Sequence, residues 1–125
     1  MKKIKIIFQT AKLTLTAELF DTPTGQKVWE ILPHKTPINT WGEEIYFDIP
    51  VTLSLEPGAR KNVEVGEIGY WDVGKSMCLF WGRTPASKGD KPVAASPVTI
   101  FGKIIGDPTV LSAVEDGAEV IVEKI

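Results

Sequence analysis

Apolar and polar residues alternate with a period of two along most of the chain, beginning at residues 3–8 and 13–19. A strand with one buried face produces such alternation, because successive side chains point to opposite faces of a sheet. We therefore expect two half-buried strands joined by a tight connection at residues 10–11. The apolar face of the first strand is formed by Ile4, Ile6 and Phe8, and the inward face of the second by Leu13, Leu15, Ala17 and Leu19.

The same pattern predicts five further strands, at residues 44–50, 66–71, 76–82, 98–105 and 118–123. Residues 77–81 are all apolar, which is typical of a strand that is buried on both faces or lines a pocket. Residues 84–97 contain three prolines and one glycine among small polar residues, so this stretch is expected to be a long surface loop.

Two short helices are predicted from capping residues that precede proline. Thr22 is followed by Pro23 and then by apolar residues at helical spacing, which indicates a helix over about residues 23–32. A second helix is predicted over 108–114, where a proline again follows a capping residue, Asp107.

Many short strands, two short helices and no regular alternation of strand with helix favour a mostly β fold. We expect a closed antiparallel barrel with the helices plugging it. A chain of 125 residues is long enough for one core but too short for two, so residues 1–125 are expected to form a single domain.

Charge and composition exclude several function classes. Fourteen basic and sixteen acidic residues give a net charge of -2, which argues against nucleic acid as a partner. No apolar run is long enough to cross a membrane, and the N-terminal apolar stretch is interrupted by Lys5, so we expect no membrane association and a cytoplasmic location. Low Asn and Gln content beside many Ile, Val, Lys and Glu residues is typical of proteins from hot environments.

One cysteine and one histidine limit the chemistry available to the chain. Cys78 excludes an internal disulfide, and together with His34 it is too little for a Cys/His metal site, so no metal or other cofactor is expected. His34 is interpreted as an exposed loop residue and Cys78 as a small buried apolar residue. Neither has the partners that a catalytic nucleophile requires.

Three stretches, taken in order, resemble the cyclophilin fold. They are Glu18–Pro23 with the helix after it, Gly69–Trp71 with Met77–Trp81, and Phe101–Asp107 with the helix after it. Shorter motifs are similar to the small prokaryotic cyclophilin-like family, whose members are stand-alone domains of about this length with no settled activity. These motifs are Trp41–Phe47, Gly69–Trp71 and Gly82–Pro85.

The chain departs from the pattern of cyclophilins that isomerise prolyl bonds. Their run of Arg, Phe and Gln-Gly is matched by Ile49–Leu55, which has none of these residues, and their histidine position falls near Val98. The resemblance therefore implies a domain that binds a small molecule or a proline-containing peptide, with weak or no isomerase activity.

The alternative is a divergent peptidyl-prolyl cis-trans isomerase in which Arg83 or Arg60 is the donor and Phe80 is the floor of the proline pocket. A third interpretation is a subunit that binds a protein partner or forms a homo-oligomer.

The candidate ligand-binding residues are aromatic or charged side chains at strand ends, most of them next to glycine. Arg83 directly follows an aromatic strand, where a planar donor can stack on rings and also form paired hydrogen bonds, whereas Arg60 is expected to be a solvated surface charge. If Ile45 faces the core, Glu44 faces outward and Glu43 points inward, either toward a ligand or to bond a loop. Packing in the core is the alternative role for the aromatic residues. The candidate site consists of Trp41, Glu43, Tyr70, Trp71, Phe80 and Arg83.

Overall fold

The computed structural model describes all residues, 1–125, as ten strands with one α-helix and one 3-10 helix. The helices are α1 (Pro23–Glu30) and η1 (Pro108–Ala113). The strands are β1 (Lys2–Phe8), β2 (Leu13–Leu19), β3 (His34–Pro37), β4 (Asn39–Thr40), β5 (Glu44–Asp48), β6 (Arg60–Asn62), β7 (Glu67–Trp71), β8 (Ser76–Phe80), β9 (Val93–Ile105) and β10 (Glu119–Lys124).

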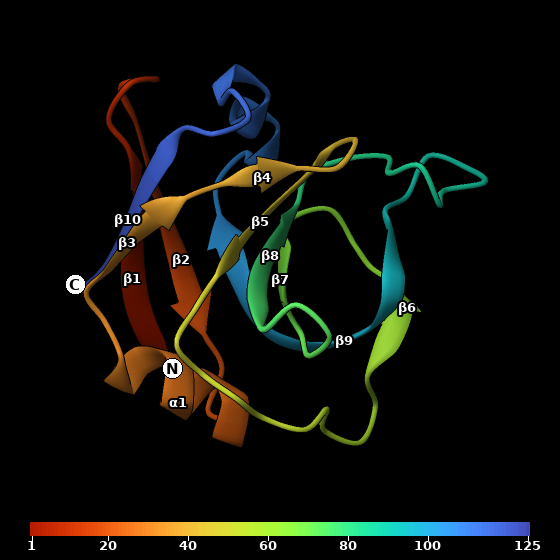
Figure 1. Ribbon diagram of the computed structural model, residues 1–125, viewed down its shortest axis with the longest axis horizontal. Helices are drawn as coiled ribbons and strands as arrows, with labels where there is room; N and C mark the ends of the chain where they lie inside the picture. The colour runs from red at the N-terminus through yellow and green to blue at the C-terminus, as the bar shows by residue number, and fades with distance from the viewer.

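Every strand pair in the sheet is antiparallel, and the order of hydrogen-bonded neighbours is β3-β10-β1-β2-β9-β7-β8-β5-β4, with β6 on the side of β9. The predicted mostly β, antiparallel architecture with two short helices is thus confirmed. Closure of the barrel is not confirmed, because β3 and β4 are the two ends of this strand order and are not hydrogen-bonded neighbours. In Figure 1 the strands curve around a common centre, with α1 at one end and η1 at the other.

The strand pair predicted at the N-terminus forms with the expected faces. Ile4 pairs with Ala17 and Ile6 with Leu15, and all four side chains are buried. Leu13 is only half-buried because it begins its strand at the edge of the core. Burying an aliphatic side chain of this size stabilises the fold by about 1.5–3 kcal/mol, so this face contributes much of the driving force for folding.

Both helices begin where the capping residues predict. The Thr22 hydroxyl accepts a hydrogen bond from the Gly25 N–H at 3.0 Å, and the Asp107 carboxylate accepts one from the Thr109 N–H at 3.0 Å. Each helix ends slightly earlier than expected. Val28 of α1 and Leu111 of η1 are fully buried in the main core, so each helix is held by its apolar face.

The largest departure from prediction lies in β9, which begins at Val93 and therefore occupies part of the expected loop 84–97. Its first part leaves the main sheet and runs beside β6 (Figure 1). This part covers the outer face of β7 and β8, where a second, smaller apolar cluster forms. The cluster consists of Val63, Cys78, Phe80, Ala94 and Val98.

Candidate functional site

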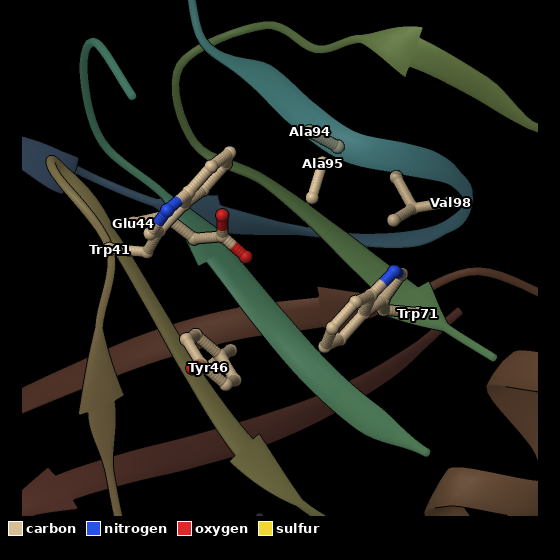
Figure 2. A pocket seen from close by; sticks show the side chains of 7 residues that line it. All are labelled: Trp41, Glu44, Tyr46, Trp71, Ala94, Ala95 and Val98. Atoms are coloured by element: carbon tan, nitrogen blue, oxygen red, sulfur yellow. The ribbon is translucent and has the colours of Figure 1, made fainter. Parts of the chain in front are cut away.

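A hollow of about 170 Å³ lies on the outer face of β5 and β7, under the first part of β9 (Figure 2). Six of its seven lining residues are hydrophobic, and the seventh is a glutamate. We call this hollow the aromatic pocket. Its lining residues are Trp41, Glu44, Tyr46, Trp71, Ala94, Ala95 and Val98.

Strand β5 supplies two lining residues through its two-residue alternation. Ile45 and Phe47 face the main core and are buried, so Glu44 and Tyr46 share the opposite face. That face was expected to meet solvent, but β9 covers it. Glu44 therefore faces away from the main core, as expected, but is only 6% exposed because of this cover.

Trp41 is held over Glu44 by a tight corner that requires glycine at position 42. The Trp41 N–H donates to the Glu44 carbonyl at 3.0 Å, and the Glu44 N–H donates to the Trp41 carbonyl at 3.2 Å. Gly42 has a φ of 59°, and a Cβ there would lie 2.9 Å from the Arg83 carbonyl oxygen. A larger residue would therefore move both the corner and the tryptophan that it carries.

Trp71 forms the opposite wall and is fixed from two sides. Its indole N–H donates to the Ser96 hydroxyl at 2.7 Å, which ties the ring to β9. Its ring meets that of Tyr46 edge to face, with centroids 6.0 Å apart and planes at 81°. Aromatic pairs in this arrangement contribute about 0.5–1.5 kcal/mol beyond the area they bury, so this contact favours the observed position of the Trp71 ring.

The Glu44 carboxylate points into the space between Trp41 and Trp71 (Figure 2). Its one hydrogen-bonding neighbour in the protein is the Cys78 thiol, and no N–H or O–H group donates to it. Burial raises the pKa of Glu44 to about 7, while the neighbouring Cys78 thiol acts in the opposite direction. The group is therefore poised to exchange a proton near neutral pH.

Cys78 lies on β8 opposite Tyr46 and is fully buried. Burial, and then the charge of Glu44, raise the pKa of its thiol well above the usual range. A thiol in that state is a poor nucleophile, in agreement with its interpretation as a small buried apolar residue. No three His, Cys, Asp or Glu side chains lie close enough together to hold a metal ion.

The predicted site residues are divided among four places. Trp41 and Trp71 line the aromatic pocket. Tyr70 faces the main core, where its hydroxyl donates to the Val51 carbonyl at 2.8 Å. Phe80 is fully buried in the smaller apolar cluster and does not line the pocket.

Glu43 and Arg83 meet each other outside the pocket. The Glu43 carboxylate accepts a hydrogen bond from the Arg83 backbone N–H at 2.9 Å, which is the loop-bonding role considered for Glu43. The Arg83 side chain is exposed and does not line the hollow. Of the candidate site residues, Trp41 and Trp71 therefore line the hollow, whereas Phe80 and Arg83 do not.

Five lining residues were missed, namely Glu44, Tyr46, Ala94, Ala95 and Val98. One signal in the sequence points to Glu44 and Tyr46. The strand 77–81 is apolar on both faces, so its outer face must be covered, and the neighbouring strand β5 shares that covered face. Nothing comparable marks residues 94–98, whose small residues and proline are typical of a loop.

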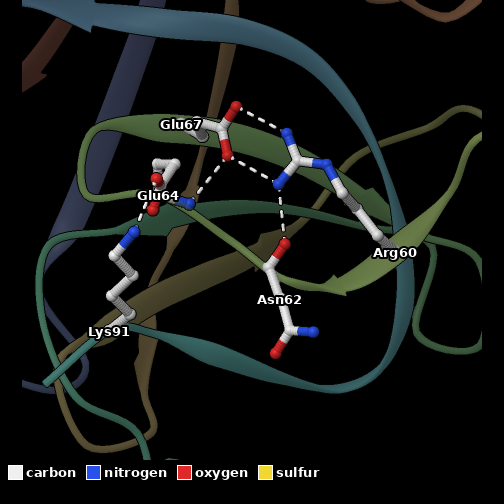
Figure 3. Close-up of polar contacts among 5 residues, drawn as sticks. All are labelled: Arg60, Asn62, Glu64, Glu67 and Lys91. Atoms are coloured by element: carbon white, nitrogen blue, oxygen red, sulfur yellow. Dashed lines mark hydrogen bonds and ion pairs between the residues drawn. The ribbon is translucent and has the colours of Figure 1, made fainter. Parts of the chain in front are cut away.

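Arg60 is held in an ion pair rather than left free for catalysis. Its guanidinium donates two hydrogen bonds to the Glu67 carboxylate, at 2.9 and 2.7 Å, and one to the Asn62 carbonyl (Figure 3). Glu67 also accepts from the Glu64 N–H, and Glu64 pairs with Lys91 at 2.9 Å. These contacts secure the segment that carries β6, and they occupy three of the five N–H donors of Arg60.

Both a protein family and solved structures match this chain over nearly its whole length. The family model described as Cyclophilin-like matches residues 2–123, nearly the whole chain. The chain belongs to the cyclophilin-like family. The fold of this cyclophilin-like chain is similar to the solution structure of the hypothetical protein AF2241 from Archaeoglobus fulgidus, with 36% identity and a TM-score of 0.82. That match covers 99% of this chain and 95% of AF2241.

A second solved structure shares the cyclophilin-like fold at low identity. It is McbB in complex with tryptophan, with 15% identity and a TM-score of 0.73. The match covers 97% of this chain but 44% of McbB, so the chain spans less than half of that protein. No curated protein matches the chain significantly. None of its helices has the length and apolar character needed to cross a membrane.

Proposed function

We propose that this cyclophilin-like domain binds a small molecule in the aromatic pocket and has weak or no prolyl isomerase activity. The observation that carries the proposal is the Glu44 carboxyl, which belongs to a residue only 6% exposed and opens into the aromatic pocket. Its one hydrogen-bonding neighbour in the protein is the Cys78 thiol, a weak donor, so its oxygens keep acceptor capacity directed at the hollow. A bound molecule would supply stronger donors.

The walls of the pocket favour a ligand over water. Trp41, Tyr46 and Trp71 present large rigid aromatic surfaces, and β9 adds three small aliphatic side chains. Binding sites for small molecules have this composition, a mostly apolar lining with few polar groups that fix the orientation of the ligand.

The size of the hollow favours a small molecule over an extended peptide. A closed apolar cavity of about 150 Å³ holds one benzene ring, and the aromatic pocket is similar, at about 170 Å³. A single side chain, such as the ring of a proline, would also fill it. A proline-containing peptide is therefore included among the ligands to be tested.

The absence of a free guanidinium in the pocket argues against efficient isomerisation. Rotation about a prolyl bond has a barrier of about 20 kcal/mol, and an isomerase lowers it with a donor that stabilises the twisted amide. Arg60 is paired with Glu67, and the Arg83 side chain lies outside the aromatic pocket. Glu44 is the one charged residue that lines the hollow.

We include closure of the barrel in this proposal, because residues 34–40 lead directly into the corner that carries Trp41. Strands β3 and β4 follow each other with Ile38 between them, so residues 34–40 span the two ends of the ladder. Ile38 is 1% exposed, donates to the Ala118 carbonyl and accepts from the Gly117 N–H. Slow hydrogen exchange at the Ile38 and Gly117 amides would support closure, and fast exchange at both would contradict it.

The test uses the indole N–H resonances of the four tryptophans in ¹⁵N-labelled protein. Small aromatic compounds, free tryptophan because McbB was solved with it, and a short X-Pro peptide are added in turn. A ligand of the pocket should shift the signals of Trp41 and Trp71 and leave Trp29, on α1, unchanged. Ala95→Leu should abolish these shifts, because Ala95 is exposed and points into the hollow (Figure 2). Absence of any shift, or shifts that persist in Ala95→Leu, would contradict the proposal.

A further inference from the structure

We infer that the ligand of the aromatic pocket is a small organic ammonium ion, and that Glu44 is its counter-ion. This inference rests on the proposed ligand-binding function and names the class of molecule that the pocket selects. It follows from three features of the site, which are its charge, its walls and the acceptor capacity of the Glu44 carboxylate.

The charge of the pocket is carried by one residue. Glu44 is the single ionisable acid or base among the seven lining residues apart from the Tyr46 phenol, and no Lys, Arg or His lines the hollow. An ionised carboxylate without a counter-charge is strongly disfavoured when it is 6% exposed. A cation would remove that penalty, a neutral molecule would leave it, and an anion would increase it.

The walls suit a cation as well as an apolar group. Aromatic rings attract an ammonium group placed over their faces, and tryptophan does so most strongly. Trp41 and Trp71 flank the Glu44 carboxylate on two sides, and Tyr46 lies on the third (Figure 2). An ammonium group bound to the carboxylate would therefore be surrounded by rings, while its apolar part would fill the hollow toward β9.

The donors around the carboxylate point to an N–H on the ligand. The Trp71 indole N–H is bonded to Ser96 at 2.7 Å and faces away from Glu44. The Cys78 thiol, a weak donor, is the one hydrogen-bonding neighbour of the carboxylate, so its oxygens keep acceptor capacity for a ligand. An ammonium N–H would form a charge-assisted hydrogen bond with them, which is about twice as strong as a neutral one.

Binding of a cation must be linked to loss of a proton from Glu44. Burial raises the pKa of this carboxyl to about 7, so the empty pocket holds a neutral carboxyl below that pH, whereas an ammonium ion favours the carboxylate. The titratable groups that face Glu44 are the Cys78 thiol on β8 and the Tyr46 phenol on β5. The other elements around it, β7, β9 and the corner at Trp41, contribute side chains that do not titrate. Affinity for an ammonium ion should therefore rise with pH between 5 and 8.

The experiment compares benzylamine, which is protonated in this range, with benzyl alcohol, a neutral molecule of the same shape. Binding is measured by the indole N–H shifts of Trp41 and Trp71 in the wild-type protein, in Glu44→Gln and in Glu43→Gln. Glu43→Gln is the matched control, since this neighbouring carboxylate lies outside the pocket and bonds the Arg83 N–H. We expect wild-type protein and Glu43→Gln to bind benzylamine about tenfold or more tightly than benzyl alcohol, and Glu44→Gln to lose this preference.

A second measurement does not depend on any variant. Benzylamine affinity of the wild-type protein should increase about tenfold or more from pH 5 to pH 8, while benzyl alcohol affinity should not increase. Equal binding of the two compounds at Trp41 and Trp71, or a preference that survives in Glu44→Gln, would overturn the inference and leave the proposed function standing. If no compound of either kind moves these two signals, the proposed function itself fails.

Discussion

Glu43 and Glu44 are adjacent in the sequence, yet their carboxylates have opposite environments. Glu43 accepts a hydrogen bond from the Arg83 backbone N–H at 2.9 Å, whereas Glu44 has no N–H or O–H partner and lines the aromatic pocket. The alternation of β5 separates them, and the first part of β9 covers the side on which Glu44 lies. One carboxylate therefore stabilises a corner of the fold, and the other is free to meet a ligand.

Replacing Glu44 should change the pH dependence of stability. Between pH 4.5 and about 7 the folded protein retains a proton on Glu44 that the unfolded chain has lost, so the free energy of unfolding falls as pH rises through this window. Glu44→Gln removes this effect. We expect the variant to match the wild type near pH 4 and to exceed it by about 1–3 kcal/mol at pH 8, measured by urea denaturation. A wild type that is the more stable of the two at pH 8 would contradict the buried, unpaired state of Glu44.

The ion pair between Arg60 and Glu67 should have the opposite pH dependence. Burial acts to raise the pKa of Glu67, but the hydrogen bonds from Arg60 and the Glu64 N–H and the charge of Arg60 outweigh it and lower the pKa. Its stabilising contribution is therefore present at neutral pH and lost as pH falls below about 4.5. Because the pair is partly exposed, we expect Glu67→Gln to cost about 0.5–1 kcal/mol at pH 7 and less at pH 3. An equal loss of stability at pH 7 and pH 3 would show that the charge of Glu67 does not contribute to the stability of the fold.

The face assignment of β2 predicts a large difference between two neighbouring substitutions. Leu15 is 6% exposed in the main core, whereas Thr14 is exposed on the other face of the same strand. Leu15→Asp should destabilise the protein by about 3–5 kcal/mol because it buries an unpaired charge, and Thr14→Asp should cost far less. Thermal denaturation of both variants tests this. A folded Leu15→Asp protein with an unchanged midpoint of thermal denaturation would show that the face assignment of β2 is wrong.

Prolyl isomerase activity should be weak or absent. The donors of Arg60 are engaged by Glu67 and Asn62, and the Arg83 side chain does not reach the aromatic pocket. A protease-coupled assay on a short X-Pro peptide, with exchange NMR as a check, measures this directly. Turnover like that of an ordinary cyclophilin, abolished by Arg60→Ala or Arg83→Ala, would favour the isomerase interpretation.

The elements that could be predicted from the sequence are those whose pattern of apolar residues reflects contact with the main core alone. Strands β1 and β2 alternate because one face meets that core, and both helices begin at a capping residue followed by proline. The site depends on a second contact, the folding of Val93–Ile105 over the outside of the sheet. Local composition does not reveal this contact, because Pro97 and its small neighbours are typical of a loop. The outward direction of Glu44 could therefore be predicted but its cover could not, and Trp41 and Trp71 were found by their strand-end positions alone.

The proposed role of Glu44 as counter-ion is tested most directly by its own titration. Glutamate side chains labelled with ¹³C at the carboxyl carbon are followed by NMR from pH 3 to 10, with the Glu44 signal assigned by its absence in Glu44→Gln. We expect a pKa of about 7 in the empty protein and a marked decrease when benzylamine is present at saturation. A pKa near the ordinary value of 4.5, or a raised pKa that benzylamine leaves unchanged, would contradict the role proposed for Glu44.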